Sequence, residues 1–429
     1  MKPNHLIIIG HREVWGSAQE VGMSLCDFRQ HLYVCGKTGT GKSTLLKSMI
    51  IQHIQAGGGV GLIDPHGDLS EEILEYIPPS RASDLAYFNP ADIEFPVGFN
   101  PLFLVEPDAR ARVAAGIVGA LKGIWRDSWG PRMEYVLLAA VRALLDCQNV
   151  TILGIPRMLT DPIYRMWVVR QSRDPMIRSF WLSEFGSYDK RFMAEVIAPV
   201  QNKVGQLAMN PLIRNILGQV RNRLDLGFIM DDQRIFIANL SKGRIGADTS
   251  NLLGSLLIAQ FQDAAMRRAF IPEQERRDFL LVIDEFSSFG TDIFSAMLSE
   301  ARKYRLALVL AHQFVNQLAP EIREAVIGNV GTLCVFRTGS SDAEIFEKEL
   351  GNGIGAERFT DLPNFRMLVK MMADGSSAMP FEASTALPAF RQHGRSANLI
   401  RHSRARHGSR RRTVEAKIRR WSGNTSLNS

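Results

Sequence analysis

Cysteine is scarce in this sequence, and the cysteines that are present do not pair in any familiar pattern. The four residues, Cys26, Cys35, Cys147 and Cys334, lie far apart, with no C-x-x-C pair and no matching histidine cluster. Neither a zinc site nor a disulfide framework is indicated by such spacing. We therefore expect a chain that folds without covalent cross-links in a reducing cytoplasm.

Long hydrophobic runs are also missing. The apolar stretches LIIIG, YVLLAAV and FLLVIDEF are too short to span a bilayer, and no segment near the start combines a basic region, an apolar region and a cleavage site. No internal repeat is evident. With 429 residues, 45% of them hydrophobic, the chain is long enough for two or three packed units. We expect a soluble globular protein.

Acidic residues are few in two stretches of a chain whose net charge is +7. Residues 391–429 hold eleven Lys and Arg against one acid, Glu415, and residues 105–222 hold sixteen against ten. These stretches are two places where a polyanion such as DNA could be attracted. The alternative is that the arginines form solvated helix faces without a partner, and charge alone does not decide between the two.

The hydrophobic pattern predicts an α/β fold with a helical insertion. Residues 1–104 alternate short apolar runs with helical ones, and strand signals return in RIFIANL, DFLLVIDEF, LALVLAHQ and TLCVFRTG within 223–388. This alternation indicates one mostly parallel central sheet built from both stretches. Between them, residues 105–222 show helical periodicity and almost no strand signal, so we expect an inserted all-α domain. Its four tryptophans, Trp125, Trp129, Trp167 and Trp181, are more typical of core packing than of base stacking. Residues 389–429 resemble a flexible, basic tail with one short helix-compatible piece, TVEAKIRRW.

A glycine-rich loop near the start matches the pattern G-x-x-x-x-G-K-[ST]. The stretch VCGKTGTGKST supplies Gly36, Gly41, Lys42 and Ser43, after an apolar run and before a helix-compatible one. Such a loop turns its backbone amides toward phosphate oxygens at a helix N-terminus. Lys42 would reach the β- and γ-phosphates of a bound nucleotide, and the Ser43 hydroxyl would ligate Mg²⁺. The residues expected to bind the nucleotide are Gly36, Thr38, Gly39, Thr40, Gly41, Lys42, Ser43 and Thr44. The alternative is a glycine-rich turn that binds nothing.

An acidic pair follows the apolar strand in DFLLVIDEF. Asp284 and Glu285 would stand at the carboxyl end of the strand, where open parallel sheets bind ligands. Asp284 can hold Mg²⁺, and Glu285, pointing the other way, can orient or deprotonate the attacking water. Gln313, at the end of LALVLAHQ, can sense the γ-phosphate. Taken alone, such acids are as common at helix N-caps.

Hydrolysis also needs a further positive charge on the transferred phosphoryl group, which ring-shaped motors take from a neighbouring subunit. Arg302 in SEARKYRL is the first candidate, followed by Arg305 and Arg337. Each of the three arginines could equally form an ion pair at the surface.

Several motifs in a fixed order resemble the type IV coupling proteins of conjugation and type IV secretion (TraG/TraD-like), within the FtsK/HerA class of DNA pumps. They are CGKTGTGKST, IDPHGDL, YFNPADIEFPVGFNPL, IANLSKGRIG, LVIDEF and SEARKYRLALVLAHQFVNQL followed by GNVGTLCVFRTG, and the likeness covers about residues 30–390. The resemblance implies a RecA-like P-loop NTPase that binds ATP and Mg²⁺. It also implies a hexameric motor that moves DNA, often single-stranded or bound to a relaxase, toward a secretion channel.

The resemblance also assigns roles to residues already singled out. Lys42 and Ser43 belong to the loop, Asp284 and Glu285 to the second motif, Gln313 is the sensor, and Arg302 acts in trans.

One departure concerns the membrane. Typical coupling proteins begin with transmembrane helices, whereas about 30 residues precede the loop here. We expect a cytoplasmic chain that docks on a membrane-embedded partner, or else a soluble HerA-like translocase in DNA processing. A third possibility is a receptor that recruits its substrate and uses ATP only as a switch; Glu285 favours turnover instead.

Overall fold

The computed structural model describes residues 6–125, 129–289, 292–351, 353–373, 376–385 and 390–423. The chain divides into two compact units. Unit 1 comprises Met1–Phe88, Leu226–Lys242 and Ala264–His402, and unit 2 comprises Asn89–Asp225, Gly243–Asp263 and Ser403–Ser429. The division falls within three helices, α13 (Lys242–Ile245), α14 (Ala247–Arg267) and α19 (Ser396–His407). The domain boundaries expected near residues 104, 222 and 388 stay a prediction.

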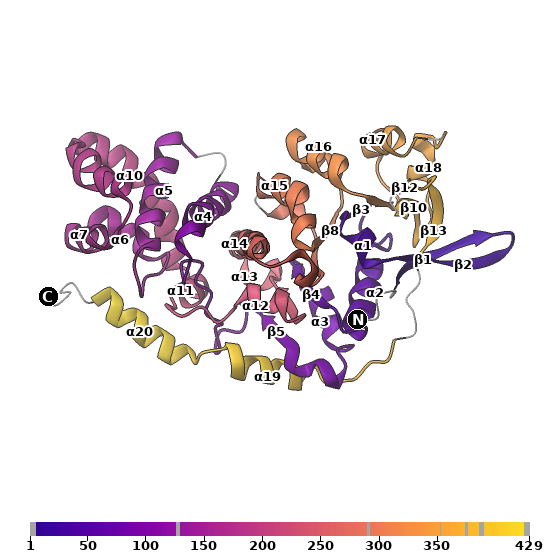
Figure 1. Ribbon diagram of the computed structural model, residues 1–429, viewed down its shortest axis with the longest axis horizontal. Coiled ribbons are helices and arrows are strands. Elements are labelled where there is room, and N and C mark those ends of the chain that lie inside the picture. The colour runs from indigo at the N-terminus through magenta and orange to yellow at the C-terminus, as the bar shows by residue number, and fades with distance from the viewer. Residues whose placement is uncertain are drawn as a thin grey trace. The chain divides into compact units, whose positions relative to one another are not determined.

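Unit 1 is built on an eleven-stranded sheet with the strand order β2-β1-β13-β10-β9-β3-β8-β7-β4-β6-β5 (Figure 1). The seven strands from β9 to β5 are parallel, and the four from β2 to β10 form an antiparallel edge. Their bounds are β1 Ile7–Val14, β2 Ser17–Met23, β3 Leu32–Cys35, β4 Gly59–Asp64, β5 Leu85–Phe88, β6 Ile235–Asn239, β7 Phe279–Ile283, β8 Leu306–His312, β9 Thr332–Val335, β10 Arg366–Lys370 and β13 Phe381–Ser384. The mostly parallel α/β fold predicted from the sequence is confirmed.

The helices of unit 1 cover both faces of this sheet. Their bounds are α1 Leu25–Phe28, α2 Lys42–Gln55, α3 Asp68–Leu74, α12 Leu226–Asp231, α15 Asp292–Glu300, α16 Pro320–Asn329, α17 Ser340–Leu350 and α18 Ala356–Thr360. Short turns of 3₁₀-helix add η1 Pro79–Asp84, η7 Phe286–Ser288, η8 Ala301–Tyr304 and η9 Val315–Gln317. A separate two-stranded ribbon pairs β11 Met372–Ala373 with β12 Ser376–Ser377.

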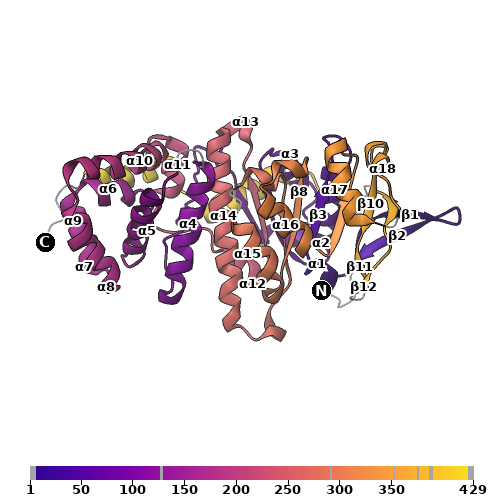
Figure 2. The ribbon, with the colours of Figure 1, turned by 90° about the horizontal axis from the view of Figure 1, so that it is seen from above.

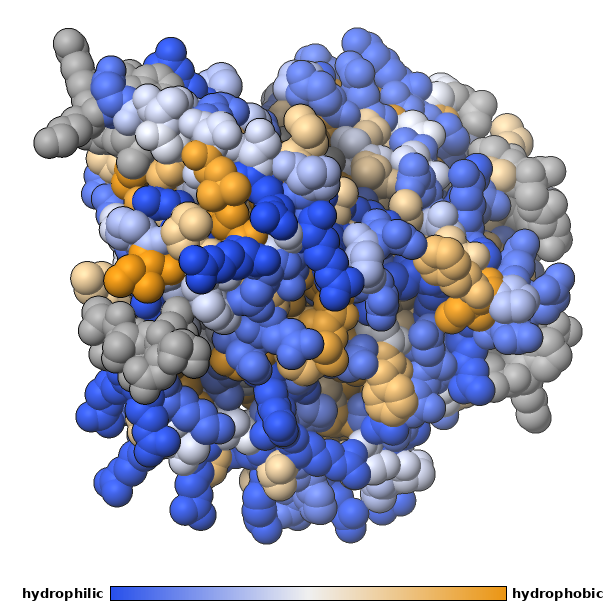
Figure 3. All heavy atoms as spheres, turned by 60° about the vertical axis from the view of Figure 1, so that its left-hand side comes forward, coloured by the Kyte–Doolittle hydropathy of each residue, from blue (hydrophilic) through white to orange (hydrophobic). Residues whose placement is uncertain are grey.

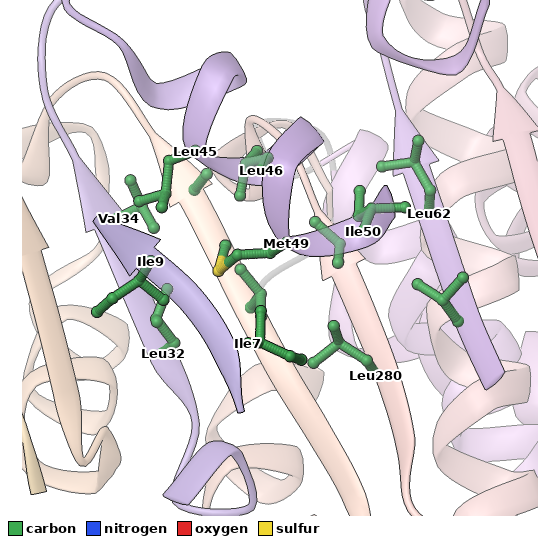
Figure 4. Close-up of a cluster of buried hydrophobic side chains, with 14 of the residues drawn as sticks. Ile7, Ile9, Leu32, Val34, Leu45, Leu46, Met49, Ile50, Leu62 and Leu280 are labelled. Carbon is green, nitrogen blue, oxygen red and sulfur yellow. The ribbon is translucent and has the colours of Figure 1, made fainter. Parts of the chain in front are cut away.

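In strand β3 successive side chains point to opposite faces of the sheet, so the strand contributes to the core of unit 1 on both sides. Leu32 and Val34 point to the face covered by α2 and α3, where they meet Leu45 and Met49. Figure 4 shows these side chains between the sheet and α2. Tyr33 points to the opposite face, toward Phe286 of η7 and Phe346 of α17. All four residues of β3 are buried, as expected for a central parallel strand.

Unit 2 is helical. The residues of unit 2 that lie between β5 and β6 form helices and, within the described ranges, no strand. These helices are η2 Pro107–Ala109, α4 Arg110–Ile124, α5 Pro131–Leu145, α6 Gly154–Thr160, α7 Pro162–Gln171, α8 Pro175–Ser179, α9 Phe185–Ser187, α10 Lys190–Met209 and α11 Pro211–Leu217, with a π-helical turn at Phe180–Glu184. Helix α4 lies along α14, where Arg112 pairs with Asp263 (Figure 2). Trp181 is buried and donates to Ala139 O at 3.3 Å, in keeping with a packing role.

The C-terminal region differs from the expected loop-like tail. It forms α19 and a second helix, α20 (Arg411–Gly423). In α20, Val414, Ile418 and Trp421 recur at the spacing of one helix face, and Val414 is buried. Arg411 forms an ion pair with Glu415 one turn later. The arginine-rich composition obscures this short apolar stripe in the sequence.

The cysteines and the helix lengths follow the sequence analysis. All four cysteines are free thiols, and three of them, Cys35, Cys147 and Cys334, are buried. None of the helices in the described ranges is both long and apolar enough to cross a membrane.

Candidate active site

The glycine-rich loop connects β3 to α2 at the carboxyl edge of the parallel strands, as the sequence predicts. At Gly36 the loop passes so close to Phe336 that a Cβ atom would lie 2.5 Å from the Cβ of that residue. At Gly41 the backbone φ is 122°, in a region that side chains rarely adopt. Glycine is therefore required at both ends of the loop for steric reasons.

Helix α2 begins directly after the loop, and no side chain caps its N-terminus. Its first amides are consequently available to an anion, and the helix dipole adds a partial positive charge at the same place. Lys42 is buried, and its ammonium donates to Gly36 O at 2.5 Å and to Lys37 O at 3.1 Å. Burial lowers the pKa of Lys42, while Glu285 and Asp284 act in the opposite direction. The Ser43 hydroxyl stands on the exposed side of the same turn.

The acidic pair follows β7. The sequence predicts that Glu285 points away from Asp284, as it would in an extended strand; in the structure both residues line one cavity. The reason is the backbone of Glu285, which leaves the strand in the left-handed conformation at φ 45° and ψ 47°. A non-glycine residue in this region is uncommon and strained, and such residues concentrate at functional sites.

The environment of Asp284 disfavours its charged form. The carboxyl group is 5% exposed, and burial together with the charges of Asp64 and Glu285 raises its pKa to about 7. Lys42 and the amide of Glu285, which donates to Asp284 Oδ1 at 3.1 Å, lower the pKa by smaller amounts. A divalent cation beside Asp284 would relieve the repulsion among these carboxylates.

Gln313 lies at the end of β8 and faces the same cavity. The chain on both sides of it is anchored. His312 is buried with a ring nitrogen 3.1 Å from Tyr33 Oη, and Val315 donates its amide to Asp342 Oδ2 at 3.1 Å. Gln313 is thereby held at the edge of the site by groups on β3 and α17.

The cavity has a volume of about 470 Å³, within the range of small-molecule sites. Its lining residues come from the glycine loop and the start of α2, from the end of β4 and α3, from the acidic pair, and from the chain after β8 and before β10. They are Thr38, Gly39, Gly41, Lys42, Ser43, Thr44, Asp64, His66, Asp68, Leu69, Glu72, Asp284, Glu285, Gln313 and Phe365. The structure thus brings together loop, acidic pair and glutamine from segments some 240 residues apart.

Two features of the cavity escape the sequence analysis. Asp64 ends β4 fully buried and accepts hydrogen bonds from the amides of His66, Gly67 and Ser70 at 2.8–2.9 Å. The motif IDPHGDL contains it, but nothing in that motif marks it as a neighbour of Asp284. Phe365, directly before β10, has no sequence signal at all.

The residues present fit a nucleotide with Mg²⁺. Uncapped amides and Lys42 suit the phosphates, while Ser43 and Asp284 supply two oxygen ligands of the kind Mg²⁺ prefers. The described residues contain no group of three or more His, Cys, Asp or Glu able to hold a metal by themselves.

The three candidate arginines do not line the cavity. Arg302 is exposed in η8, before the amino end of β8, whereas Gln313 follows the carboxyl end of the same strand. Seven residues of strand separate the two by roughly 20 Å. Arg302 therefore does not reach the cavity of its own chain, and its role in trans stays a prediction. Arg305 donates to Arg276 O, and Arg337 donates to Leu362 O and to Asn364 Oδ1.

Comparisons with known proteins agree with this geometry. Residues 13–104, which include the loop, match the family model described as the central domain of the helicase HerA. No curated protein sequence matches the chain significantly.

Solved structures share the fold over nearly the whole chain. The plasmid coupling protein TrwB in complex with ADP and Mg²⁺ is similar with a TM-score of 0.66 and 16% identity, over 92% of this chain and 98% of that one. VirB4 of Thermoanaerobacter pseudethanolicus is similar with a TM-score of 0.54 and 13% identity, over 90% and 97%. The resemblance to coupling proteins and to the HerA class is thus confirmed, and the fold is that of the P-loop NTPase TrwB.

Proposed function

We propose that this protein is an ATP-hydrolysing, hexameric DNA translocase that couples DNA, or a relaxase bound to DNA, to a conjugative or type IV secretion machine. One observation carries the proposal. The glycine loop and the acidic pair line a single cavity, on a fold shared with TrwB, which binds ADP and Mg²⁺. In this chain ATP and Mg²⁺ would occupy that cavity.

Each residue of the site has a chemical task in hydrolysis. The loop amides and Lys42 hold the phosphates, and Mg²⁺, when bound by Ser43 and Asp284, neutralises part of their charge. Glu285 orients the attacking water and accepts its proton. Gln313 contacts the γ-phosphate and transmits its loss to β8 and to the turn that Asp342 anchors.

Glu285→Gln tests the catalytic part of the proposal. The amide keeps the size of the side chain but cannot accept the proton of water, so we expect ATP binding to persist while DNA-stimulated phosphate release falls roughly 10²- to 10⁴-fold. Binding is measured by calorimetry and release by a phosphate sensor, with single- and double-stranded DNA. Glu321→Gln, an exposed acid on α16, is the control and should keep the wild-type rate. Undiminished turnover in the Glu285 variant would remove this residue from the mechanism.

The cationic C-terminal helices support DNA as the partner. Arg401, Arg404 and Arg406 of α19 and Arg412, Arg419 and Arg420 of α20 are all exposed. In Figure 3 the face of the helical unit that is turned forward is largely hydrophilic, interrupted by separate hydrophobic areas. The six exposed arginines, by their positive charge, suit a polyanion such as DNA. The membrane-embedded channel remains a partner that we propose by analogy with coupling proteins.

A second candidate is a HerA-like translocase in DNA processing, which the match of residues 13–104 to the HerA model favours. It shares the ATPase site and DNA but would work with a nuclease instead of a secretion channel. Affinity purification of the intact chain from its own cells separates the two. Recovery of a nuclease would favour the HerA-like function, and recovery of relaxase or channel subunits would favour coupling.

A further inference from the structure

Phe365 is exposed at the edge of the nucleotide cavity in an unusual conformation. The residue is 48% exposed, and its φ of 65° lies in the left-handed region that phenylalanine rarely adopts. Its side chain lines the cavity together with Gly41 and Lys42. The ring lies against Gly41, where an added Cβ atom would be 3.2 Å from Phe365 Cδ1, and about half of the residue stays open to solvent. A strained backbone at a half-exposed aromatic residue points to a role beyond core packing.

The backbone on both sides of Phe365 is tied to its surroundings. Its amide donates to Thr40 O in the loop at 2.7 Å, and its carbonyl accepts from the amide of Thr385 at 2.8 Å. The Arg337 guanidinium adds bonds to Leu362 O and to Asn364 Oδ1, so the segment before β10 is fastened to the end of β9. The backbone that carries the ring is consequently tied to the phosphate loop.

The strand order shows which part of a nucleotide would reach this ring. The loop follows β3, the acidic pair follows β7 two strands to one side, and Phe365 precedes β10 two strands to the other side. Because β10 is antiparallel to β9, its amino end lies at the same sheet edge as the loop. At about 4.8 Å per strand, each group lies roughly 10 Å from β3. A triphosphate with its γ-phosphate at Glu285 therefore directs its nucleoside end toward Phe365.

We propose that Phe365 is the platform on which the nucleobase stacks. This inference rests on the proposed ATPase function and adds the part of the site that recognises the base. The ring offers a π face and neither donor nor acceptor, so it binds adenine and guanine alike. Specificity for a purine nucleotide over bare polyphosphate comes from this contact. The site would accept both ATP and GTP.

Nucleotide binding by variants of Phe365 tests the proposal. Calorimetry with Mg²⁺ compares ADP, GDP and inorganic tripolyphosphate on the full chain. Phe365→Leu keeps an apolar side chain without the π face. It should weaken the binding of ADP and GDP about tenfold and leave the affinity for tripolyphosphate unchanged. Phe365→Trp, which again supplies a π face, should bind both nucleotides with the wild-type affinity. Phe270→Leu, another exposed phenylalanine of unit 1, is the matched control.

Each outcome has a distinct meaning. Unchanged ADP affinity in Phe365→Leu would overturn the platform, and so would an equal loss for ADP and tripolyphosphate, because the ring would then act only through the shape of the loop. Tripolyphosphate binding therefore separates loss of the contact to the base from a change in the phosphate loop. Failure of the wild-type chain to bind any nucleotide would overturn the proposed function together with the platform.

Discussion

At the scale of single residues, Asp284 links the chemistry of the site to stability. Its pKa of about 7 in the folded chain lies above the usual aspartate value of 3.8. A raised pKa means that the group contributes most to stability below the unfolded value, and that this contribution is lost as the pH rises through the folded value. Without a bound ligand, the folded chain therefore becomes less stable when Asp284 ionises.

Asp284→Asn makes this relation measurable. Without nucleotide or metal, we expect wild type to lose roughly 2–3 kcal/mol of stability relative to the variant between pH 5 and pH 8, because only wild type must ionise the buried group. Denaturant unfolding at the two pH values measures the difference. A gap between the two proteins that does not change with pH would show that Asp284 ionises freely.

Individual residues also show which parts of the site a sequence pattern can predict and which it cannot. Gly36, Lys42 and Ser43 are recognisable because phosphate binding needs those residue types at that spacing. Phe365 and Asp64 are not, since they reach the cavity through the order of strands in the sheet. The turn at Glu285 was not predicted for a related reason, because a left-handed backbone after a strand leaves no local signature.

At the scale of elements, the buried parallel strands were predictable and the edges were not. Strands β3, β4, β7 and β8 are short apolar runs that end at turns or polar residues, so they stand out in the sequence. The antiparallel strands β10 and β13 mix polar with apolar residues because each is partly exposed. Helix α20 was predicted only in part, as the helix-compatible piece TVEAKIRRW, because only three apolar positions mark its buried face.

The charges of α20 give a prediction at this scale. Arg412→Gln with Arg420→Gln removes two exposed charges while leaving the buried Val414 and the Arg411–Glu415 pair intact. If both arginines contact single-stranded DNA, the slope of log affinity against log salt should become shallower by about 1.4. Fluorescence anisotropy at several salt concentrations measures the slope.

Lys303→Gln with Lys348→Gln, two exposed charges of unit 1, is the matched control and should keep the wild-type slope. An unaltered slope in the α20 variant would leave this helix as a packing element or a site for another partner.

At the scale of the whole molecule, the distant position of Arg302 requires a second subunit if this residue is to act in hydrolysis. Arg302→Ala and Glu285→Gln should each be inactive alone. Mixed in equal amounts, they should recover about a quarter of wild-type ATPase activity, because that fraction of head-to-tail interfaces would pair an intact glutamate with an intact arginine.

Turnover per subunit measured against mixing ratio tests this arrangement, with Lys303→Ala as the neighbouring control. An active Arg302→Ala protein, or mixtures without recovery, would assign the finger to another residue.

The central claim is that the glycine loop and the acidic pair hold one magnesium-bound triphosphate. Calorimetric titration of ATP with and without Mg²⁺, on wild type and on Asp284→Asn, tests it most directly. We predict that Mg²⁺ tightens binding to wild type at least tenfold, and that the variant loses this gain while its metal-free affinity is not weakened. An equal gain from Mg²⁺ in both proteins would contradict the claim, because the metal would then be bound without Asp284.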